Sequence, residues 1–559
     1  MMGSLKFIQR SLSSNLYKHK ARSLFNSLAE ASTGSVNVLG TRAQRWTCTK
    51  QRQRYVASHW SSLRRVSTLT EDLSLNKQQD LKGYESCNNH GRNFTTSSNV
   101  LISRNGRISG KSPDYSVKPN KSGDEVDVFG NYQVAYGSKT TWELVRTLTV
   151  FFFCKFSAFT DNAVHLMSLC YKILGRRISN VLIGRTVYDQ FVAGTTPHEL
   201  AEVIARLRHG GVGPMLCTPI ECDADGEPPQ EEFFDESLEK ILASLQLALR
   251  LNDPHPMFQY RFSALMSGDI LKTVSKLCSE TTHNQEVIEA IIAGMKGRPV
   301  NFSQLPGWSS FPDDKIDVFS RALRRLGKIS EAMKPVDVIG LVDAEYTYLN
   351  PALRLLALAM MKDCNTEKAK LFFTYQGYLK ATPSILGSDV AYAKDNGFCF
   401  GLKLVRGAYM VKERQLARQL GYEDPVHESF DKTTESYHSC LDLLLTNVMT
   451  SRPLSLRFFI ASHNEDTVRY AMRRMAELGI RKDGGSVFFG QLYGMADHVS
   501  FTLGHDGYRI YKSIPYGSIA DTLPYLSRRA QENKSILANA RRERALVAKT
   551  LKSRLLFMN

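Results

Sequence analysis

Residues Phe398–Val405, with the sequence FCFGLKLV, form a short and mostly apolar run that ends at the polar, glycine-containing segment Arg406–Tyr409, RGAY. A helical pattern follows at Arg414–Leu420. A buried strand, a polar turn and a helix in this order make the unit from which parallel sheets are built. The same unit recurs along most of the chain, so this stretch indicates the fold of the whole.

Eight apolar or β-branched runs have the length of buried strands, and helical segments separate them. The runs are Val212–Cys217, Met257–Leu265, Val338–Ala344, Leu371–Tyr375, Phe398–Val405, Arg457–Ala461, Ser486–Gly490 and Tyr508–Ile514. The helical segments are Glu199–Arg208, Ser237–Leu251, Pro351–Met361, Val390–Lys394, Arg414–Leu420, Thr433–Met449, Asp466–Leu478 and Ile519–Asn533. Eight strands is the number that closes a (β/α)8 barrel. The alternative is an open, doubly wound sheet, but no GxGxxG phosphate loop follows any of the runs.

Two further helical regions belong to this architecture. Residues 266–337, between the second and third runs, show helical pattern around 269–295 and 313–333, so we expect a helical insertion there. Residues 126–190 also carry apolar side chains at three-to-four spacing. The sequence therefore predicts an α/β barrel with N-terminal helices and a helical insertion between strands 2 and 3.

The net charge of +17 is concentrated at the N-terminus. Residues 1–70 contain twelve Lys or Arg and one acid, Glu30, which gives 12 − 1 = +11. This segment is also rich in serine and has no clean apolar core, which is typical of a mitochondrial transit peptide. The alternative is a basic arm that binds polyanions. Residues 71–125 are polar and are predicted to be a disordered linker, so the barrel domain is expected at 126–559.

The cysteines and the apolar runs limit the class of protein further. Ten cysteines are scattered without a CxxC pair, which favours a reducing compartment and argues against a disulfide framework or a zinc site. No stretch reaches 18 uninterrupted apolar residues, so we expect no transmembrane helix. The most apolar run, Leu148–Cys154, is too short to span a bilayer and is expected to be a packed helix, or else to lie against a membrane surface.

Polar side chains stand where most of the predicted strands end, which is where a barrel places its chemistry. They are Arg261, Asp343, Glu345, Gln376, Lys403, Arg406, His463, Gln491 and Ser513. Each alone has an ordinary structural explanation, such as a helix cap for Asp343 or a salt bridge for Arg406. Together they indicate a site, because buried charges persist only when they are paired or bound to a ligand. The excess of cations suits an anionic ligand, a cofactor that carries phosphates, or both.

Two common kinds of catalytic site are not indicated. His463 and Asp466 have neither the spacing nor the ligand number of a metal site. No strand leads into a GxSxG elbow, so a serine hydrolase is not expected.

The last helical segment carries an unusual polar face. Tyr525, Arg528, Arg529 and Glu532 stand at i, i+3, i+4 and i+7 and therefore share one side of a helix. Two adjacent guanidinium groups make a fork for a planar anion such as a carboxylate. The alternative is a solvated helix in which Arg528 pairs with Glu532, worth only about 0.2–0.5 kcal/mol.

Several of these segments together resemble the proline dehydrogenase family over roughly residues 140–550. The motifs are Leu404–Tyr409, Ser462–Thr467 and Tyr525–Asn533, with Phe191–Gly194, Val342–Glu345 and Phe489–Leu492 in matching order. The resemblance implies a distorted (β/α)8, TIM-like barrel that holds FAD and oxidises a cyclic amino acid by hydride transfer to the flavin. It also implies that electrons pass to quinone (ubiquinone) at the mitochondrial inner membrane, on its matrix side.

The resemblance also implies roles for individual residues. Arg528 and Arg529 would clamp the substrate carboxylate, Tyr525 would pack on the substrate ring, and Glu532 would brace the arginines. Asp343 is similar to an acidic residue that orders the arginine cluster. The positions that match the flavin lining are Gln376, Lys403, Arg406, Gly407, Ala408, Tyr409, His463 and Gln491. A cation beside the flavin would stabilise the negative charge that arrives with the hydride.

Two departures from the family pattern bear on the substrate. Arg261 stands where the family has a lysine that contacts the carboxylate, so the charge is kept with a bulkier fork. Ser513 stands where proline dehydrogenases place a tyrosine against the substrate ring. The smaller side chain leaves room and a hydrogen-bond partner for a 4-hydroxyl group, which resembles the hydroxyproline dehydrogenase branch.

Three alternatives remain open at this stage. Ser513 is also compatible with neutral drift within an enzyme that oxidises L-proline. A barrel that binds an anionic metabolite without redox chemistry would belong to a different class. A nucleic-acid-binding protein is disfavoured, because residues 140–550 lack basic side chains interleaved with aromatic ones.

Overall fold

The computed structural model describes residues 127–156, 162–220, 229–278, 282–519, 522, 525, 526, 529 and 540–557. The predictions for the transit peptide at 1–70, the linker at 71–125, and the side chains of Arg528 and Glu532 lie outside these residues.

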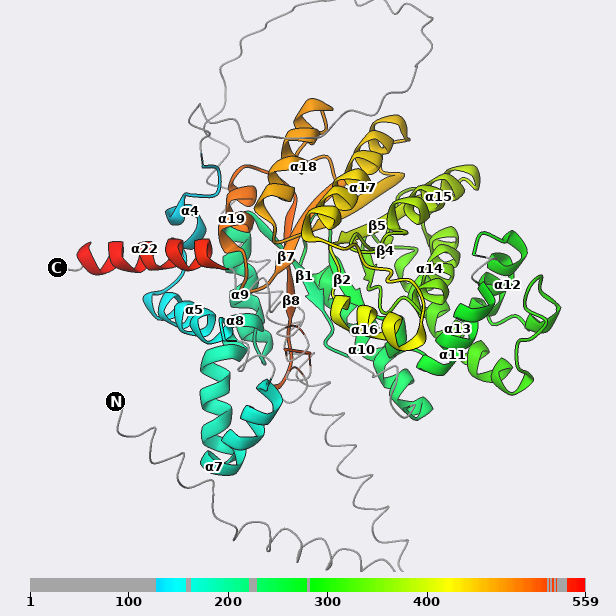
Figure 1. The fold of residues 1–559 in the computed structure, drawn as a ribbon, viewed down its shortest axis with the longest axis horizontal. Helices are drawn as coiled ribbons and strands as arrows, with labels where there is room; N and C mark the ends of the chain where they lie inside the picture. The colour runs from blue at the N-terminus through cyan, green and yellow to red at the C-terminus, as the bar shows by residue number, and fades with distance from the viewer. Residues whose placement is uncertain are drawn as a thin grey trace, which may run out of the picture. The chain divides into compact units, whose positions relative to one another are not determined.

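Eight parallel strands close into a barrel in chain order, with β1 paired to both β2 and β8 (Figure 1). The strands are β1 (Val212–Cys217), β2 (Met257–Tyr260), β3 (Ile339–Val342), β4 (Leu371–Gln376), β5 (Phe400–Val405), β6 (Leu456–Ala461), β7 (Val487–Leu492) and β8 (Ile510–Pro515). Each strand overlaps one of the eight predicted runs. The pairing of β1 with β8 excludes the open, doubly wound alternative.

One strand boundary differs clearly from the prediction. The second run was expected to extend to Leu265, but β2 ends at Tyr260 and a 3-10 turn follows at Phe262–Ala264. Residues 262–266 are buried although they are not in a strand. Their apolar sequence therefore reflects packing of the turn, and it could not be distinguished from a strand by hydrophobicity alone.

Helices connect the strands and surround the barrel. They are α9 (Pro197–His209), α10 (Glu231–Arg250), α11 (Gly268–Cys278), α12 (Gln285–Met295), α13 (Ile316–Met333), α14 (Asn350–Cys364), α15 (Thr382–Asp395), α16 (Met410–Leu420), α17 (Phe430–Thr450), α18 (Glu465–Glu477) and α19 (Asp497–His505). α9 illustrates how the sequence starts them: Thr196 and Glu199 form a reciprocal capping box around Pro197. α11, α12 and α13 are the predicted insertion between β2 and β3 (Figure 1).

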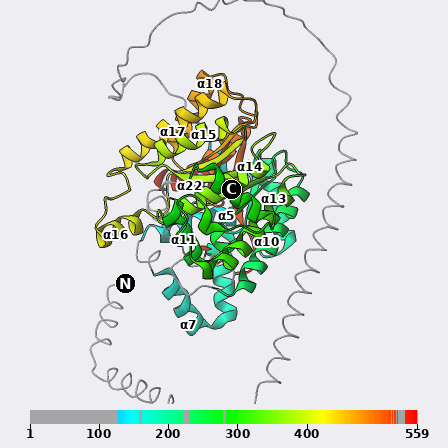
Figure 2. The same ribbon diagram turned by 90° about the vertical axis from the view of Figure 1, so that its right-hand side faces the viewer.

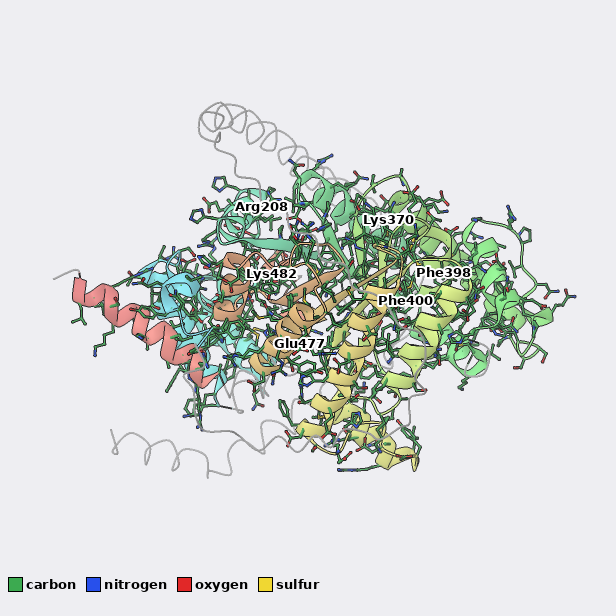
Figure 3. The ribbon with its side chains drawn as sticks, turned by 90° about the horizontal axis from the view of Figure 1, so that it is seen from above. Arg208, Lys370, Phe398, Phe400, Glu477 and Lys482 are labelled. Atoms are coloured by element: carbon green, nitrogen blue, oxygen red, sulfur yellow. The ribbon has the colours of Figure 1, made fainter. Side chains whose placement is uncertain are left out.

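The barrel interior is apolar at the N-terminal ends of the strands. Met257, Ile339, Phe372, Phe488 and Tyr511 occupy the first or second position of five strands and pack in one buried cluster. Figure 3 is a view from above in which residues near the strand beginnings are labelled, among them Lys370, Phe400 and Lys482. One charged side chain, Arg457 of β6, is also buried at this end, where it lies 5.1 Å from the Phe488 ring centroid and donates to the carbonyls of Gly485 and Ala369. The interior polar side chains of Gln259, Lys403 and Ser513 lie nearer the C-terminal ends of their strands.

Helices at both ends of the described chain pack together beside the barrel. They are α4 (Tyr132–Tyr136), α5 (Thr141–Cys154), α7 (Ala163–Ile183), the π-helical turn η3 (Gly184–Tyr188), α8 (Asp189–Phe191) and α22 (Arg541–Phe557). Ala135, Tyr136, Leu144 and Val547 join α4, α5 and α22 in one buried cluster. Sequence reasoning anticipated the helices at 126–190 but identified neither α19 nor α22.

A buried ionic network fastens α19 to β8. The Asp497 carboxylate lies 2.9 Å from Nζ of Lys512, whose side chain is fully buried, and 2.8 Å from Nζ of Lys139. Glu543 of α22 accepts hydrogen bonds from the backbone N–H groups of Ala496 and Asp497. Burial opposes ionisation of Asp497, but the charges of Lys139 and Lys512 outweigh burial and hold its pKa well below the usual range.

We expect Asp497→Asn to lower the free energy of unfolding by about 3–5 kcal/mol, because it leaves the buried Lys512 without its counter-ion. A folded-state pKa below the unfolded value contributes stability above about pH 4, and this contribution is lost as the pH falls. The wild-type protein should therefore lose more stability than the variant between about pH 5 and pH 3. Urea unfolding at both pH values measures the difference.

Asp506→Asn is the matched control, because Asp506 directly follows α19 and makes its ion pair with the exposed His505. The control should stay within about 0.5 kcal/mol of the wild type. Equal stability of the Asp497 and Asp506 variants would show that the network does not hold α19 in place.

Candidate active site

A connected group of polar side chains occupies the barrel interior near the C-terminal ends of the strands. Gln259 lies within β2 and Arg261 follows its end, Asp343 follows β3, Lys403 lies in β5, and Ser513 lies in β8. Four of these five residues were predicted from the sequence as site residues, and the structure brings them together. Gln259 was not predicted.

Asp343 is the centre of this group. Its carboxylate accepts hydrogen bonds from Nζ of Lys403 at 2.5 Å and from Nε2 of Gln259 at 3.1 Å. Nε of Arg261 lies 3.6 Å from the same carboxylate. Burial tends to raise the pKa of Asp343, but the charges of Lys403 and Arg261 outweigh this effect and lower it. Asp343 is therefore an ionised carboxylate that fixes two cations.

Gln259 connects the Asp343 carboxylate to Ser513. While its amide nitrogen donates to Asp343, its Oε1 accepts a hydrogen bond from Ser513 Oγ at 3.5 Å. β2 and β8 both flank β1, so the two side chains meet inside the barrel. The sequence signal was available, because Gln259 is a polar residue in the otherwise apolar strand Met257–Tyr260.

Tyr525 and Arg529 are the two described residues of the predicted polar helix face. Tyr525 is buried in a cluster with Cys217 and Val192. The Arg529 guanidinium carbon lies 5.3 Å from the centroid of the Tyr525 ring, a cation–π arrangement that fixes both groups. The positive charge of Arg529 also helps to lower the pKa of Asp343.

These side chains border a narrow, partly open pocket with a volume of about 10 Å³, roughly the room for one water molecule. Its lining residues are Cys217, Thr218, Ile220, Gln259, Tyr260, Arg261, Asp343 and Tyr525. The pocket combines an aromatic ring with a fixed cation, Arg261, and an ionised acid. The lining is therefore complementary to a small zwitterion in its charges and in its apolar part.

The segment that follows β5 is held in one conformation. Gly407 has a φ of 139°, and a Cβ atom at this position would stand only 1.6 Å from the ring of Tyr378. The guanidinium of Arg406 lies 4.2 Å from the Phe430 ring centroid and donates to Thr434. Only glycine satisfies both the dihedral angle and the close approach at 407. Ala408 and Tyr409 follow it directly, before α16 begins.

Two buried nitrogen atoms near the ends of β5 and β6 make no hydrogen bond within the described chain. They are Nη1 of Arg406 and Nδ1 of His463. β5 and β6 are neighbours with Val405 paired to Ala461, so both residues follow adjacent strand ends. Burial lowers the pKa of His463 to about 3, so its imidazole is neutral. Unpaired buried donors or acceptors are costly, and a bound polar group would satisfy both.

The two predicted glutamines are already engaged by the protein. Gln376 donates to the Glu345 carbonyl and accepts from Asn350 at 2.9 Å. Gln491 donates to the Ser462 carbonyl and accepts from Ser500 at 2.7 Å. These bonds fix the orientation of each amide, so that its remaining hydrogen-bonding capacity points in one direction.

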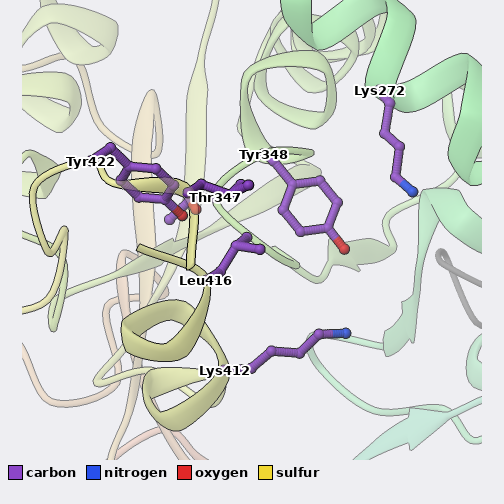
Figure 4. Close-up of a pocket in the computed structure, with 7 residues that line it drawn as sticks. Lys272, Thr347, Tyr348, Lys412, Leu416 and Tyr422 are labelled. Atoms are coloured by element: carbon purple, nitrogen blue, oxygen red, sulfur yellow. The ribbon is translucent and has the colours of Figure 1, made fainter. Parts of the chain in front are cut away.

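A second, larger pocket was missed by sequence reasoning (Figure 4). It has a volume of about 420 Å³ and is lined by Lys272, Thr347, Tyr348, Lys412, Leu416, Leu420 and Tyr422. Tyr346 stacks on Tyr348 with ring centroids 5.4 Å apart and also contacts the Tyr409 ring at 4.4 Å. The pocket is thereby joined to the segment after β5. In Figure 4 the ammonium groups of Lys272 and Lys412 extend toward the same side as the Tyr348 hydroxyl.

Within the residues that the structure describes, no group of His, Cys, Asp and Glu side chains is arranged to hold a metal ion. Among the same residues, no helix is both long and apolar enough to cross a membrane.

Comparison with known proteins identifies the family of the chain. The family model described as "Proline dehydrogenase" matches residues 255–542. Hydroxyproline dehydrogenase of Xenopus laevis is 41% identical over 418 residues, which cover 75% of this chain and 88% of that protein. Hydroxyproline dehydrogenase of Bos taurus is 38% identical over 431 residues, covering 76% and 92%. Proline dehydrogenase 1, mitochondrial, of Homo sapiens is 30% identical, covering 75% and 88%.

The family match spans the strands from β2 to β8, their connecting helices and every predicted site residue. The relatives extend the similarity over three quarters of the chain. The chain therefore belongs to the proline dehydrogenase family of oxidoreductases.

Proposed function

We propose that this protein is a mitochondrial flavoenzyme that oxidises trans-4-hydroxy-L-proline to 1-pyrroline-3-hydroxy-5-carboxylate, with FAD as hydride acceptor and ubiquinone as the electron acceptor that follows. The observation that carries the substrate assignment is the buried Ser513 hydroxyl, which is joined through Gln259 to the Asp343 carboxylate. Two hydroxyproline dehydrogenases among the relatives are consistent with this choice.

The substrate carboxylate would be bound by cations that are already in place. Arg529 is positioned by the ring of Tyr525, and Arg261 is positioned by Asp343. In our proposal Arg528 is a further cation on the substrate carboxylate, and Glu532 braces the arginines. Because Asp343 has fixed Arg261 before any ligand binds, little side-chain entropy remains to be lost on binding.

The ring would lie against Tyr525, with its 4-hydroxyl group toward Ser513. Ser513 is buried, and the amide of Gln259 orients its hydroxyl group. A tyrosine at this position would fill the space that the 4-hydroxyl group requires. Selection for the hydroxyl group is modest if Ser513 has another partner when proline is bound, and Gln259 is such a partner.

FAD would be held along the ends of β4 to β7 by Lys403, Arg406, His463 and the segment Gly407–Tyr409. The residues fit such a group, because Nη1 of Arg406 and Nδ1 of His463 are buried without partners and can pair with a polar cofactor. Bound FAD supplies the acceptor for the hydride that leaves the ring carbon next to nitrogen, and the nitrogen loses its proton, which leaves a carbon–nitrogen double bond. Lys403 and Arg406 provide positive charge where negative charge develops.

Two features support a mitochondrial location in our proposal: the composition of residues 1–70 and ubiquinone as the electron acceptor. The basic, serine-rich segment 1–70 supports import into mitochondria, and proline dehydrogenases among the relatives are named mitochondrial. Ubiquinone resides in a membrane, so we further propose peripheral association with the matrix side of the inner membrane. The domain from 126 to 559 would contain the whole catalytic apparatus.

Arg529→Ala should weaken catalysis, because one partner of a desolvated charge pair with the substrate carboxylate is lost. We expect kcat/KM for hydroxyproline to fall by the equivalent of about 2–4 kcal/mol. FAD released by acid precipitation should stay close to the wild-type amount. Steady-state kinetics with a soluble dye as electron acceptor measures the loss.

Arg509→Ala is the control, because Arg509 precedes β8 at the opposite end of the barrel and donates to the Asp483 carbonyl. Its kcat/KM should match that of the wild type. Normal kcat/KM in Arg529→Ala would show that Arg529 does not contact the substrate, and release of FMN or of no flavin would exclude FAD as the cofactor.

Ser513→Tyr should reverse the substrate preference. The wild-type enzyme is expected to favour hydroxyproline over proline by about 1–2 kcal/mol, on the order of five- to thirtyfold in kcat/KM. The tyrosine should sharply reduce turnover of hydroxyproline and preserve or raise turnover of proline. The matched variant Ser513→Ala removes the hydroxyl group without adding bulk, so it should reduce the preference but not reverse it. A wild-type preference for proline would contradict the hydroxyproline assignment and leave L-proline as the substrate.

A further inference from the structure

Exposed apolar side chains are concentrated in one part of the described chain. More than half of the large apolar side chains that are exposed lie between Trp142 and Val187. They are Trp142, Val145, Phe152, Phe153, Phe156, Leu169, Ile173, Leu174, Ile178, Val181, Leu182 and Val187. An exposed apolar patch of this kind marks a surface that binds a partner or a membrane.

Helix α7 contributes six of these side chains. Before its kink, Leu169 and Ile173 stand four residues apart and share one helix face, and Ile173 is 70% exposed. Beyond the kink, Ile178, Val181 and Leu182 are again spaced by three and four residues, and Ile178 is 61% exposed. Apolar side chains therefore continue on both halves of the helix, and no barrel element among the described residues covers them. In two views at right angles, α7 extends away from the barrel strands (Figures 1 and 2).

A glycine and a side-chain hydrogen bond define the kink in α7. Gly175 has a φ of 72°, a conformation that glycine adopts at little cost. The hydroxyl of Tyr171 donates to Oδ1 of Asn180 at 2.9 Å, which ties the two halves together across the bend. α7 is thus a braced and bent helix.

The charges of this region all have one sign. From Asn162 to Tyr188 the sequence contains Lys172, Arg176, Arg177 and Arg185, and no Asp or Glu. All four cations are exposed. An apolar stripe bordered by cations alone is complementary to an anionic lipid surface, in which acyl chains lie directly beneath negative headgroups.

We propose that α7 lies in the surface of an anionic phospholipid bilayer, with Ile173, Ile178 and Val181 among the side chains that enter the boundary between headgroups and acyl chains. Lys172, Arg176 and Arg177 would contact the lipid phosphates. α7 lies on the membrane and does not cross it, since no described helix is apolar enough to span and the bend divides it into two short halves.

A cluster of phenylalanines extends the same surface along the chain. Phe152 contacts Phe153 and Phe156 with ring centroids 5.7 Å and 5.3 Å apart, and all three rings are exposed at the end of α5. Lys155 stands between them in the sequence. Aromatic rings and lysines are favoured at the level of the lipid headgroups. We include this cluster in the membrane-binding surface.

This inference deepens the proposed function, because an enzyme that reduces ubiquinone must approach the bilayer in which the quinone is dissolved. The surface itself rests on the exposed side chains and charges alone. A negative result for vesicle binding therefore leaves the proposed reaction standing, and a negative result for substrate oxidation leaves the membrane surface standing.

The test is flotation of the full chain with vesicles of phosphatidylcholine containing cardiolipin. Wild-type protein should float with these vesicles and remain bound in part at 0.5 M salt, which removes binding that depends on charge alone. The double variant Ile173→Glu/Ile178→Glu should bind about tenfold less or weaker still. Rates with a soluble dye acceptor should be equal in both proteins.

Leu555→Glu/Leu556→Glu is the matched control, because these leucines are also exposed and lie at the end of α22. The control should float like the wild type. A second measurement uses Ile178→Trp, whose added fluorescence should be quenched by brominated lipid tails beyond the quenching seen in the wild type.

Flotation of the Ile173→Glu/Ile178→Glu variant like the wild type, or no additional quenching of Ile178→Trp, would overturn the proposal. The proposal would also be overturned if the wild-type protein did not bind vesicles but formed a dimer that the double variant does not form. The apolar face of α7 would then bind a second copy of the chain. If the wild type floats but neither substrate reduces the dye, the membrane surface stands and the proposed reaction fails.

Discussion

The ionised carboxylate of Asp343, buried inside the barrel, is the constraint on which the candidate site depends. A charge in this position is stable only with partners, and it has three: the Lys403 ammonium, the Arg261 guanidinium and the Gln259 amide. Each partner loses its freedom to rotate when it binds the Asp343 carboxylate. The lowered pKa of Asp343 shows that the cations more than offset its burial. The acid thus orients the groups that we expect to meet the substrate.

The closed barrel makes this arrangement possible by dividing its interior along the strands. Met257, Ile339 and Phe372 fill the N-terminal ends with apolar side chains. Charged and amide groups then collect at the C-terminal ends, where loops from different strands converge. β2 and β8 lie on either side of β1, and Gln259 of β2 connects them. Its amide donates to Asp343 and accepts from Ser513 of β8, so the two residues share one hydrogen-bonded connection. Ser513 and the cations beside Asp343 are therefore parts of one hydrogen-bonded unit.

Much of this could be predicted from the sequence, because a buried parallel strand followed by a polar turn is a strong local signal. All eight strands were located, and Asp343, Lys403, Arg261 and Ser513 were identified because they follow or end those strands. Gln259 was missed because the second run was expected to extend to Leu265, which placed Gln259 far from the end of the predicted strand, whereas β2 ends at Tyr260. The pocket beside Tyr348 was also missed, because its lining comes from α11, α16 and the connections beside them, and only tertiary packing brings these together. α19 was not identified, because its buried Asp497 resembles a surface residue until Lys139 and Lys512 are seen beside it.

We propose that the site around Asp343 holds a cyclic amino acid against a bound flavin. Anaerobic mixing of the protein with the amino acid tests this proposal most directly. Purified protein should be yellow, and trans-4-hydroxy-L-proline should bleach the visible flavin absorption in the absence of any other acceptor. L-proline should bleach the flavin more slowly at the same concentration. A colourless protein, or a flavin that neither compound reduces, would contradict the account and favour a barrel that binds an anionic metabolite without redox chemistry.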